Sequence, residues 1–169
     1  TNGESVFIKQ NSNPPTDFFL AEIKGLKLLA QAKKGPKIPK PIAVQSSPRP
    51  TFLLMEYIEN SSEGKNFADQ FAQSLAELHR MTQESYGLDH DNYIGNTPQK
   101  NALDKDGIHF FRDQRINFQR KLARQKGLLP ASVDKKLDSL CDNLEKYLNI
   151  SGEKPALIHG DLWSGNYFP

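Results

Sequence analysis

The sequence predicts an α+β fold with a small N-terminal sheet and one helix, followed by a mainly helical part. Two observations carry this prediction. Short β-branched and aromatic runs, with one helical pattern between them, occupy the first 58 residues. After a polar stretch over 59–65, apolar residues recur at the three- and four-residue spacing of amphipathic helices. We therefore expect two lobes, over residues 1–58 and 59–169.

The first lobe is expected to hold three strands and one helix. The run over 4–10, between a glycine and an Asn/Ser/Pro cluster, is typical of a strand. A helix is expected to begin after Asp17 and to end before Gly35. Prolines then separate two extended runs, 42–44 and 52–58, of which the second is apolar enough to be a central strand.

The second lobe is expected to consist mainly of helices. Apolar residues share one helical face over 67–78 and again over 133–148, and a third helix is expected over 108–126. The segment 86–102 is rich in Gly, Asn, Asp and Pro, which is typical of an ordered loop. A short strand is expected over 156–159, directly before a polar turn.

Composition narrows the classes of function. With 25% charged and 37% apolar residues, the 169-residue chain has the composition of a folded globular protein. The net charge is only +2 and the charges are scattered, which argues against a nucleic-acid partner. No run of about 18 apolar residues exists, so no membrane partner is expected. The single Cys141 and the lack of a signal-peptide pattern lead us to expect a cytoplasmic protein.

Residues 159–166, His-Gly-Asp-Leu-Trp-Ser-Gly-Asn, carry the strongest chemical signal. Asp161 and Asn166 lie five positions apart, which is the spacing found in kinase catalytic loops. Phosphoryl transfer needs a carboxylate that accepts the proton of the attacking hydroxyl, and an oxygen ligand for a metal ion. Asp161 suits the first role and Asn166 the second. The alternative is an ordinary turn, because Asp, Ser, Gly and Asn are common turn residues.

Two residues near the N-terminus strengthen the kinase interpretation by their order. Lys9 ends a Val-Phe-Ile-Lys run that resembles the strand carrying the phosphate-binding lysine of kinases, and Glu22 lies on the next helix, where the ion-pair partner of that lysine belongs. Each of them alone could be an ordinary surface side chain. Residues 55–58 end the apolar strand, at the place where a kinase hinge offers backbone groups to an adenine edge.

The loop at 159–166 resembles that of the fructosamine (ketosamine) kinases, which belong to the aminoglycoside-phosphotransferase-like branch of the protein-kinase-like fold. Stretches at 87–95, 97–101 and 110–115 are similar to the same family in the same order. The His-Gly-Asp element alone would indicate only the wider branch, whereas the Leu-Trp-Ser-Gly insert and the Asp-His-Asp-Asn loop are narrower signals. The resemblance extends from about Phe7 to the end of the chain.

This resemblance implies a role for each matching residue of the phosphate site. Asp161 would be the catalytic base and Asn166 a ligand of Mg²⁺. Lys9 would contact the phosphates of ATP, and Glu22 would hold Lys9 in place. His159 would brace the loop rather than react.

The resemblance also suggests how adenine and substrate are bound. The carbonyl of Glu56 and the amide of Ile58 would meet the adenine edge. Trp163 could stack on the sugar or on an amino-acid side chain of the substrate, or it could be a core aromatic residue. The adjacent Asp89, His90 and Asp91 look like metal ligands. They lack a distant partner set, however, so we expect a structural or substrate-wall role for them.

Two parts of a kinase are missing from these 169 residues. They are a nucleotide-covering loop before the strand of Lys9 and a second metal-binding Asp after the catalytic loop. We therefore expect a kinase-like, two-lobed fold that is incomplete at both ends, and an activity that belongs to a longer protein.

The function expected from the resemblance is ATP-dependent phosphorylation of a sugar hydroxyl of a ketosamine, free or protein-bound, which leads to deglycation. One alternative is another small-molecule kinase of the same branch, acting on an aminoglycoside, choline or a similar hydroxylated amine. A second alternative is a non-catalytic fragment that binds a nucleotide or a partner. The sequence leaves the oligomeric state open.

Overall fold

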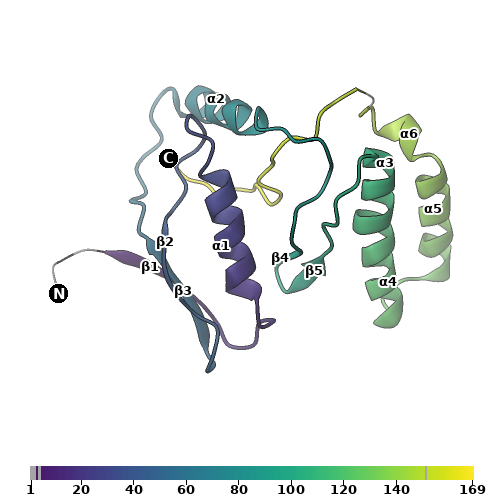
Figure 1. Ribbon diagram of the computed structural model, residues 1–169, viewed down its shortest axis with the longest axis horizontal. Coiled ribbons are helices and arrows are strands. Elements are labelled where there is room, and N and C mark those ends of the chain that lie inside the picture. The colour runs from purple at the N-terminus through teal and green to yellow at the C-terminus, as the bar shows by residue number, and fades with distance from the viewer. Residues whose placement is uncertain (1–2, 4, 151) are drawn as a thin grey trace. The chain divides into compact units, whose positions relative to one another are not determined.

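The computed structural model describes residue 3, residues 5–150 and residues 152–169, and the chain forms two compact units. The first unit comprises the chain as far as Thr82 together with Ala156–Pro169, and the second is Gln83–Pro155. The elements are a mixture of helices and small sheets, so the expected α+β class is confirmed (Figure 1). The expected lobe boundary between residues 58 and 59 lies inside the first unit and stays a prediction.

The first unit is built on an antiparallel sheet with the strand order β1-β3-β2. Its strands are β1 (Val6–Asn11), β2 (Pro41–Gln45) and β3 (Thr51–Glu56). Lys9 lies opposite Leu53 across the β1–β3 pair. The apolar run of β3 therefore forms the central strand, as predicted.

Helix α1 (Phe18–Leu29) lies against this sheet (Figure 1). Phe19 from the helix and Leu53 and Met55 from β3 form the buried core between them. Burying one such side chain contributes about 1.5–3 kcal/mol, so these three side chains hold the helix on the sheet. Along β3, buried residues alternate with partly buried ones, as expected for a strand with one face packed on a helix.

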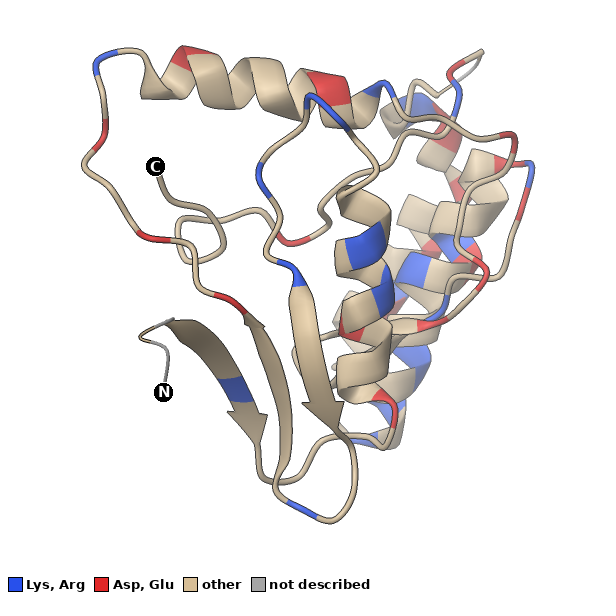
Figure 2. Ribbon diagram, turned by 60° about the vertical axis from the view of Figure 1, so that its left-hand side comes forward, with Lys and Arg blue, Asp and Glu red and all other residues tan. Residues whose placement is uncertain are grey.

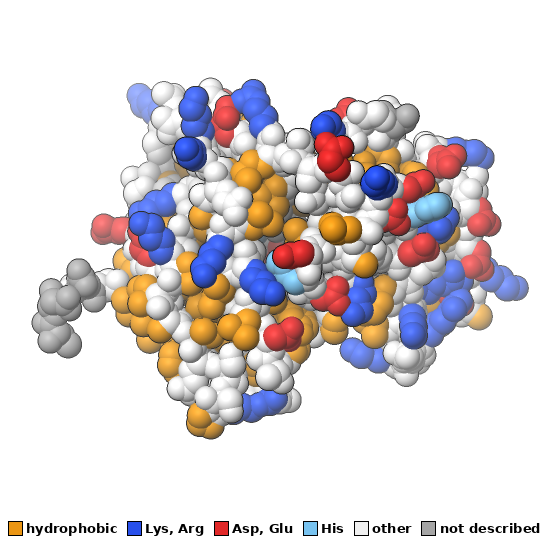
Figure 3. Space-filling view, viewed as in Figure 1, with side chains coloured by type: hydrophobic (Ala, Val, Ile, Leu, Met, Phe, Trp, Pro, Cys, Tyr) orange, Lys and Arg blue, Asp and Glu red, His pale blue; other side chains and the backbone are white. Residues whose placement is uncertain are grey.

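Strand β1 is an exposed edge. Its residues Val6, Phe7 and Ile8 keep between 43 and 59% of their surface accessible. Figure 3 shows apolar side chains gathered over the part of the surface where the sheet lies. This edge carries Lys9, so the phosphate-binding candidate sits on an open strand.

The remainder of the first unit is helix α2 (Phe67–His79) and the segment 156–169. The expectation of a strand over 156–159 was wrong, because Ala156 makes only an isolated antiparallel bridge with Thr82. The N–H of Leu157 also donates to the carbonyl of Met81 at 2.8 Å. Gly160 then takes a φ of +85°, which turns the chain out of the extended conformation and ends the pairing.

The second unit combines a hairpin with helices. These elements are β4 (Asn92–Ile94), β5 (Thr97–Gln99), α3 (Gly107–Phe110), the π-helical segment η1 (Phe111–Asn117), α4 (Phe118–Gln125), α5 (Ala131–Asp142) and α6 (Leu144–Tyr147). Helices α3, η1 and α4 follow one another without a gap, as the helix expected over 108–126 predicts. The helix expected over 133–148 is interrupted at Asn143. No helix among the described residues is long and apolar enough to cross a membrane.

Ion pairs join α4 to α5. The nearly buried guanidinium of Arg120 reaches both Asp134 and Asp138, and Arg124 bonds the same Asp134 carboxylate at 2.6 Å. Figure 2 shows basic and acidic residues interspersed along these helices. Hydrogen bonds from Arg120 and Arg124 hold the pKa of Asp134 below its usual value, so this carboxylate is ionised at neutral pH.

Candidate active site

Lys9 and Glu22 form the first pair of site candidates. The Nζ of Lys9 on β1 lies 2.6 Å from Oε1 of Glu22 on α1. Both side chains keep some exposure, and an ion pair of this kind contributes only about 0–1 kcal/mol to stability. Its main effect is therefore to hold the lysine ammonium in one direction. Contact with nucleotide phosphates stays a prediction for Lys9.

The adenine candidates follow β3. The side chain of Glu56 is tied to the segment before β2, because its Oε2 accepts the N–H of Lys40 at 3.3 Å and its Oε1 lies 3.4 Å from Nζ of Lys37. The Lys40 hydrogen bond, with a further contribution from Lys37, holds the pKa of Glu56 below its usual value. For the amide of Ile58, no hydrogen bond is found within the described part of the chain, and contact with adenine stays a prediction for both residues.

The loop 159–166 brings the two central candidates into contact. The amide nitrogen Nδ2 of Asn166 donates to Oδ2 of Asp161 at 3.0 Å and to the backbone carbonyl of the same residue at 2.7 Å. The backbone N–H of Asn166 donates to the carbonyl of Trp163 at 2.8 Å, which closes the turn. Because Nδ2 faces the carboxylate, the amide oxygen of Asn166 faces the other way and is available to a cation.

The N-terminal side of the loop is held by His159. Its Nδ1 lies 3.3 Å from the backbone nitrogen of Asp161 and accepts that N–H. Gly160 between them has positive φ, a conformation that side-chain-bearing residues rarely adopt. The expected bracing role fits this geometry, and Asp161 is presented to solvent.

Trp163 is 59% exposed, so it is not a core aromatic residue in this structure. Its ring lies over Gly165, where an added Cβ would come within 2.3 Å of the indole. The absence of a side chain at Gly165 thus leaves room for the ring. The six-membered ring of the indole is the part that lies close to the glycine, and stacking on a substrate stays a prediction.

An aromatic stack fixes the other end of the loop. Tyr167, the residue after Asn166, stacks on Phe71 of α2 with 4.6 Å between ring centroids. Phe67 stacks on Phe71 at 5.6 Å. This role of Tyr167 was not predicted from the sequence. Two aromatic residues four positions apart on one helix face, with a third directly after the catalytic-loop Asn, would have been the signal.

The donor atoms of the loop fit a magnesium ion. Mg²⁺ is commonly held by one or two protein oxygens together with phosphate oxygens and water. The amide oxygen of Asn166 provides one such ligand, while the Asp161 carboxylate accepts a hydrogen bond from Nδ2 of the same side chain. No cluster of three or more His, Cys, Asp and Glu side chains that could hold a metal occurs over the described residues. A magnesium site completed by nucleotide phosphates needs no such cluster.

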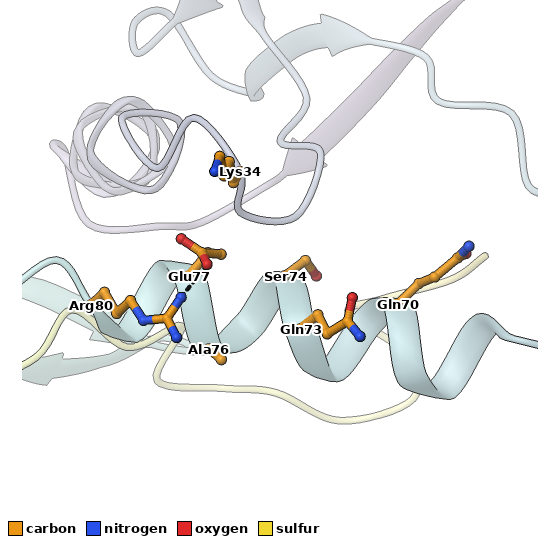
Figure 4. A pocket seen from close by; sticks show the side chains of 7 residues that line it. All are labelled: Lys34, Gln70, Gln73, Ser74, Ala76, Glu77 and Arg80. Atoms are coloured by element: carbon orange, nitrogen blue, oxygen red, sulfur yellow. Dashed lines mark hydrogen bonds and ion pairs between the residues drawn. The ribbon is translucent and has the colours of Figure 1, made fainter.

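The structure does not join all candidates into one network. Lys9 contacts Glu22, and Asp161 contacts Asn166, but no hydrogen bond or ion pair connects these two pairs among the residues that the structure describes. A pocket of about 420 Å³ in the first unit is lined by none of them. It lies between the segment after α1 and helix α2, where Glu77 and Arg80 form an ion pair (Figure 4).

The Asp-His-Asp run at 89–91 forms hydrogen bonds with the buried Asn101 in the second unit. Asp91 accepts the backbone N–H of Asn101 at 3.0 Å and also pairs with Lys100. His90 contributes its carbonyl, which accepts from Nδ2 of Asn101 at 3.1 Å, and its Nδ1 lies 2.5 Å from Asp89. A structural or substrate-wall role for this run stays a prediction.

Asn101 itself is only 1% exposed. Its Nδ2 donates to Oδ1 of Asn92 at 2.8 Å, and its Oδ1 accepts from Nη2 of Arg115, also at 2.8 Å. We call Asp91, Asn92, Asn101 and Arg115 the Asn101 cluster. It fixes the β4–β5 hairpin to the π-helical segment, and it was not predicted from the sequence.

Comparison with known proteins agrees with these motifs. The family model described as fructosamine kinase matches residues 1–168. The "Probable ketoamine kinase" of Klebsiella aerogenes is 35% identical over 165 residues, which are 97% of this chain and 56% of that protein. The "Protein-ribulosamine 3-kinase, chloroplastic" of Oryza sativa subsp. japonica is 35% identical over 170 residues, covering 98% of this chain and 48% of the relative.

Solved structures show the same likeness. The crystal structure named "Putative fructosamine-3-kinase" from Haemophilus somnus 129PT superimposes with a TM-score of 0.80 at 29% sequence identity, over 97% of this chain and 54% of that one. A structure of the same description from Thermobifida fusca gives 0.81 at 29% identity, over 98% and 56%. The chain thus spans about half the length of the relatives that it matches.

Proposed function

The chain belongs to the fructosamine kinase family, and on this premise we propose that the whole protein is an ATP-dependent kinase of ketosamines. It would phosphorylate a sugar hydroxyl of a fructosamine or ribulosamine, free or protein-bound, and so lead to deglycation. The names of the relatives support the substrate class. The observation that carries the reaction type is the hydrogen bond between Asn166 and the exposed Asp161 carboxylate.

Asp161 is the proton acceptor in this proposal. As the sugar oxygen attacks the terminal phosphorus of ATP, the hydroxyl proton passes to the carboxylate and ADP leaves. The hydrogen bond from Asn166 keeps the carboxylate in one rotamer, so that it can meet the hydroxyl without rearrangement. No covalent intermediate with the protein is needed.

The other candidates bind and orient. Asn166 would hold Mg²⁺ through its amide oxygen, and the ion supplies neutralisation of phosphate charge when bound. Lys9, steadied by Glu22, would contact the phosphates. The carbonyl of Glu56 and the amide of Ile58 would bind adenine. The exposed indole of Trp163, which lies close to Gly165, would stack on the ketosamine.

The kinase-like arrangement of two lobes belongs to the same proposal, as does a cytoplasmic location. The likeness to the two crystal structures supports the kinase-like fold. One relative is named as chloroplastic, so location within this family differs from protein to protein.

A substrate panel tests this function. The whole protein is incubated with ATP, Mg²⁺ and either a synthetic fructosyl-amine, a ribulosyl-amine, an aminoglycoside or choline, and ADP formation is measured. We expect turnover with the ketosamines and its loss in Asp161→Asn. The exposed Asp142→Asn on α5 is the matched control, since it makes the same chemical change away from the loop. Turnover only with an aminoglycoside or choline would overturn the ketosamine assignment, and nucleotide binding without any turnover would overturn catalysis.

A further inference from the structure

The second unit contains a pocket between its hairpin and its long helix. It has a volume of about 220 Å³ and is lined by Ile94, Thr97, Gln99, Arg115 and Gln119. A water molecule occupies about 30 Å³ in the liquid, so the pocket has room for roughly seven waters, or for a group of the size of a small amino acid. Four of its lining residues are neutral, and Arg115 is the single charge.

The guanidinium of Arg115 is fixed before any ligand arrives. It lies 4.5 Å from the centroid of the Phe110 ring. Nη1 donates to the carbonyls of Lys100 and Gln114, and Nη2 donates to Oδ1 of Asn101 at 2.8 Å. Because these contacts hold its rotamer, a ligand would meet a preorganised cation.

The partners of Arg115 carry no negative charge. All three acceptors are carbonyl or amide oxygens, so its charge is solvated by dipoles but not balanced. Desolvation lowers the pKa of Arg115 from its usual value, which is the sign of a partly buried cation without a carboxylate neighbour.

The nearby carboxylates are engaged elsewhere. Asp91 pairs with Lys100 and also accepts the backbone N–H of Asn101. Asp113, two residues before Arg115, is held by Arg112 at 2.9 Å and by Asn117 at 3.2 Å. The positive charge at the pocket therefore lacks a counterion among the described residues.

Arg115 also retains hydrogen-bonding capacity. A guanidinium has five N–H donors, of which three are used here. The two that remain, with the Nε–H among them, can form the charge-assisted bonds with which arginine binds carboxylates. On the pocket wall, Thr97 and the amide of Gln119, whose Nε2 also donates to the carbonyl of Pro98 at 3.2 Å, add neutral polar groups for the rest of a small ligand.

We propose that this pocket is a binding site for the carboxylate group of a small organic acid of about amino-acid size. The carboxylate binds the guanidinium of Arg115 and supplies the missing negative charge, while Ile94 and the amide of Gln119 enclose the remainder. The site lies on β4, β5, η1 and α4, and it is separate in sequence from the loop 159–166.

Binding can be tested without nucleotide, so the outcome does not depend on the kinase proposal. The whole protein is titrated calorimetrically at low salt with N-acetylglycine and with its neutral amide, N-acetylglycinamide. We expect heat of binding with the acid, and at least about tenfold weaker binding of the amide, because only the acid balances the charge of Arg115. Equal affinity for the two compounds, or no binding of the acid, would overturn the proposal.

Two variants locate the site. Gln119→Glu places a carboxylate inside the pocket while it leaves Arg115 in position, and we expect it to weaken N-acetylglycine binding by about tenfold or more through charge repulsion and occupation of the guanidinium. Gln125→Glu adds the same charge at an exposed position of α4 outside the pocket and should bind as the wild type does. Arg115→Met should abolish binding.

The comparison of Gln119→Glu with Gln125→Glu still tests the proposal if Arg115→Met fails to fold, because neither glutamine belongs to the Asn101 cluster. Equal affinities of the Gln119→Glu and Gln125→Glu variants for N-acetylglycine would contradict the assignment of the pocket.

Discussion

The loop 159–166 and the Asn101 cluster are both dense in polar side chains, but they differ in exposure. Asp161 and Trp163 of the loop are open to solvent, and the loop is held together by a few hydrogen bonds at its ends and centre. Asn101 is 1% exposed and both ends of its amide are bound to protein groups. In the first region, polar groups keep capacity for a ligand. In the second, most of them stabilise one another.

This comparison predicts that changes in the loop reduce activity and changes in the cluster reduce stability. The largest effect is expected for Asp161→Asn. Loss of a general base lowers turnover by about 10²–10⁴-fold, whereas the exposed side chain contributes little to the folded state. Steady-state ATP turnover and chemical denaturation of the same preparation provide the two readouts. Denaturation at a clearly lower denaturant concentration than for the wild type would contradict the prediction that changes in the loop leave stability intact.

Asn101→Ala should show the opposite behaviour. It removes three side-chain hydrogen bonds and leaves Nη2 of the partly buried Arg115 without its amide acceptor, which should cost about 3 kcal/mol in the free energy of unfolding. Denaturant titration measures this loss. Asn60→Ala, at an exposed position, is the matched control and should lie within about 0.5 kcal/mol of the wild type. A loss of less than about 1 kcal/mol for Asn101→Ala would contradict the structural role.

A change at Tyr167 should affect both stability and activity, because Tyr167 stacks on Phe71 and directly follows Asn166. We expect Tyr167→Ala to cost about 1–2 kcal/mol of stability, from lost stacking and burial, and also to lower turnover by freeing the end of the loop. Tyr167→Phe keeps the ring and should restore both. If the Phe variant is as impaired as the Ala variant, the hydroxyl and not the stack would be the important group.

The smallest effect concerns Asp91 in the cluster. Hydrogen bonds from Lys100, and next from the amide of Asn101, hold the pKa of Asp91 below its unfolded-state value. This carboxylate therefore adds stability above about pH 4, and the contribution is lost as the pH falls through the lower pKa of the folded state. Since the side chain is about half exposed, the contribution should stay below about 1 kcal/mol. Asp91→Asn should show a flatter loss of stability between pH 5 and pH 2. An unchanged slope would contradict this.

The same difference explains what the sequence could predict. The loop residues were identified because phosphoryl transfer restricts which residue types can stand at positions such as 161 and 166, and that restriction is visible in a single chain. Strand β3 was predicted to be central because a continuous apolar run is typical of a strand covered on both faces, and the structure places it between β1 and β2. These features are local in sequence, so pattern and spacing are sufficient to find them.

The features that were missed depend on contacts between distant residues. The β4–β5 hairpin has only three residues in each strand, and Pro98 lies within the second. Pro normally argues against a strand. The two-residue connection Gly95-Asn96 was the available signal, since Gly-Asn is a common hairpin turn. The π-helical segment carries Gln114 and Arg115, which bond to the carbonyls of Ala102 and Lys100, and these tertiary contacts have no local sequence signature.

The central claim is that the whole protein transfers phosphate to a ketosamine with Asp161 as base. The most direct measurement is a phosphorus NMR spectrum of the whole protein after reaction with ATP, Mg²⁺ and a synthetic fructosyl-amine. The account predicts a new phosphomonoester signal on the sugar, formed together with ADP and missing with Asp161→Asn. Formation of ADP and inorganic phosphate alone, without a phosphorylated ketosamine, would contradict it.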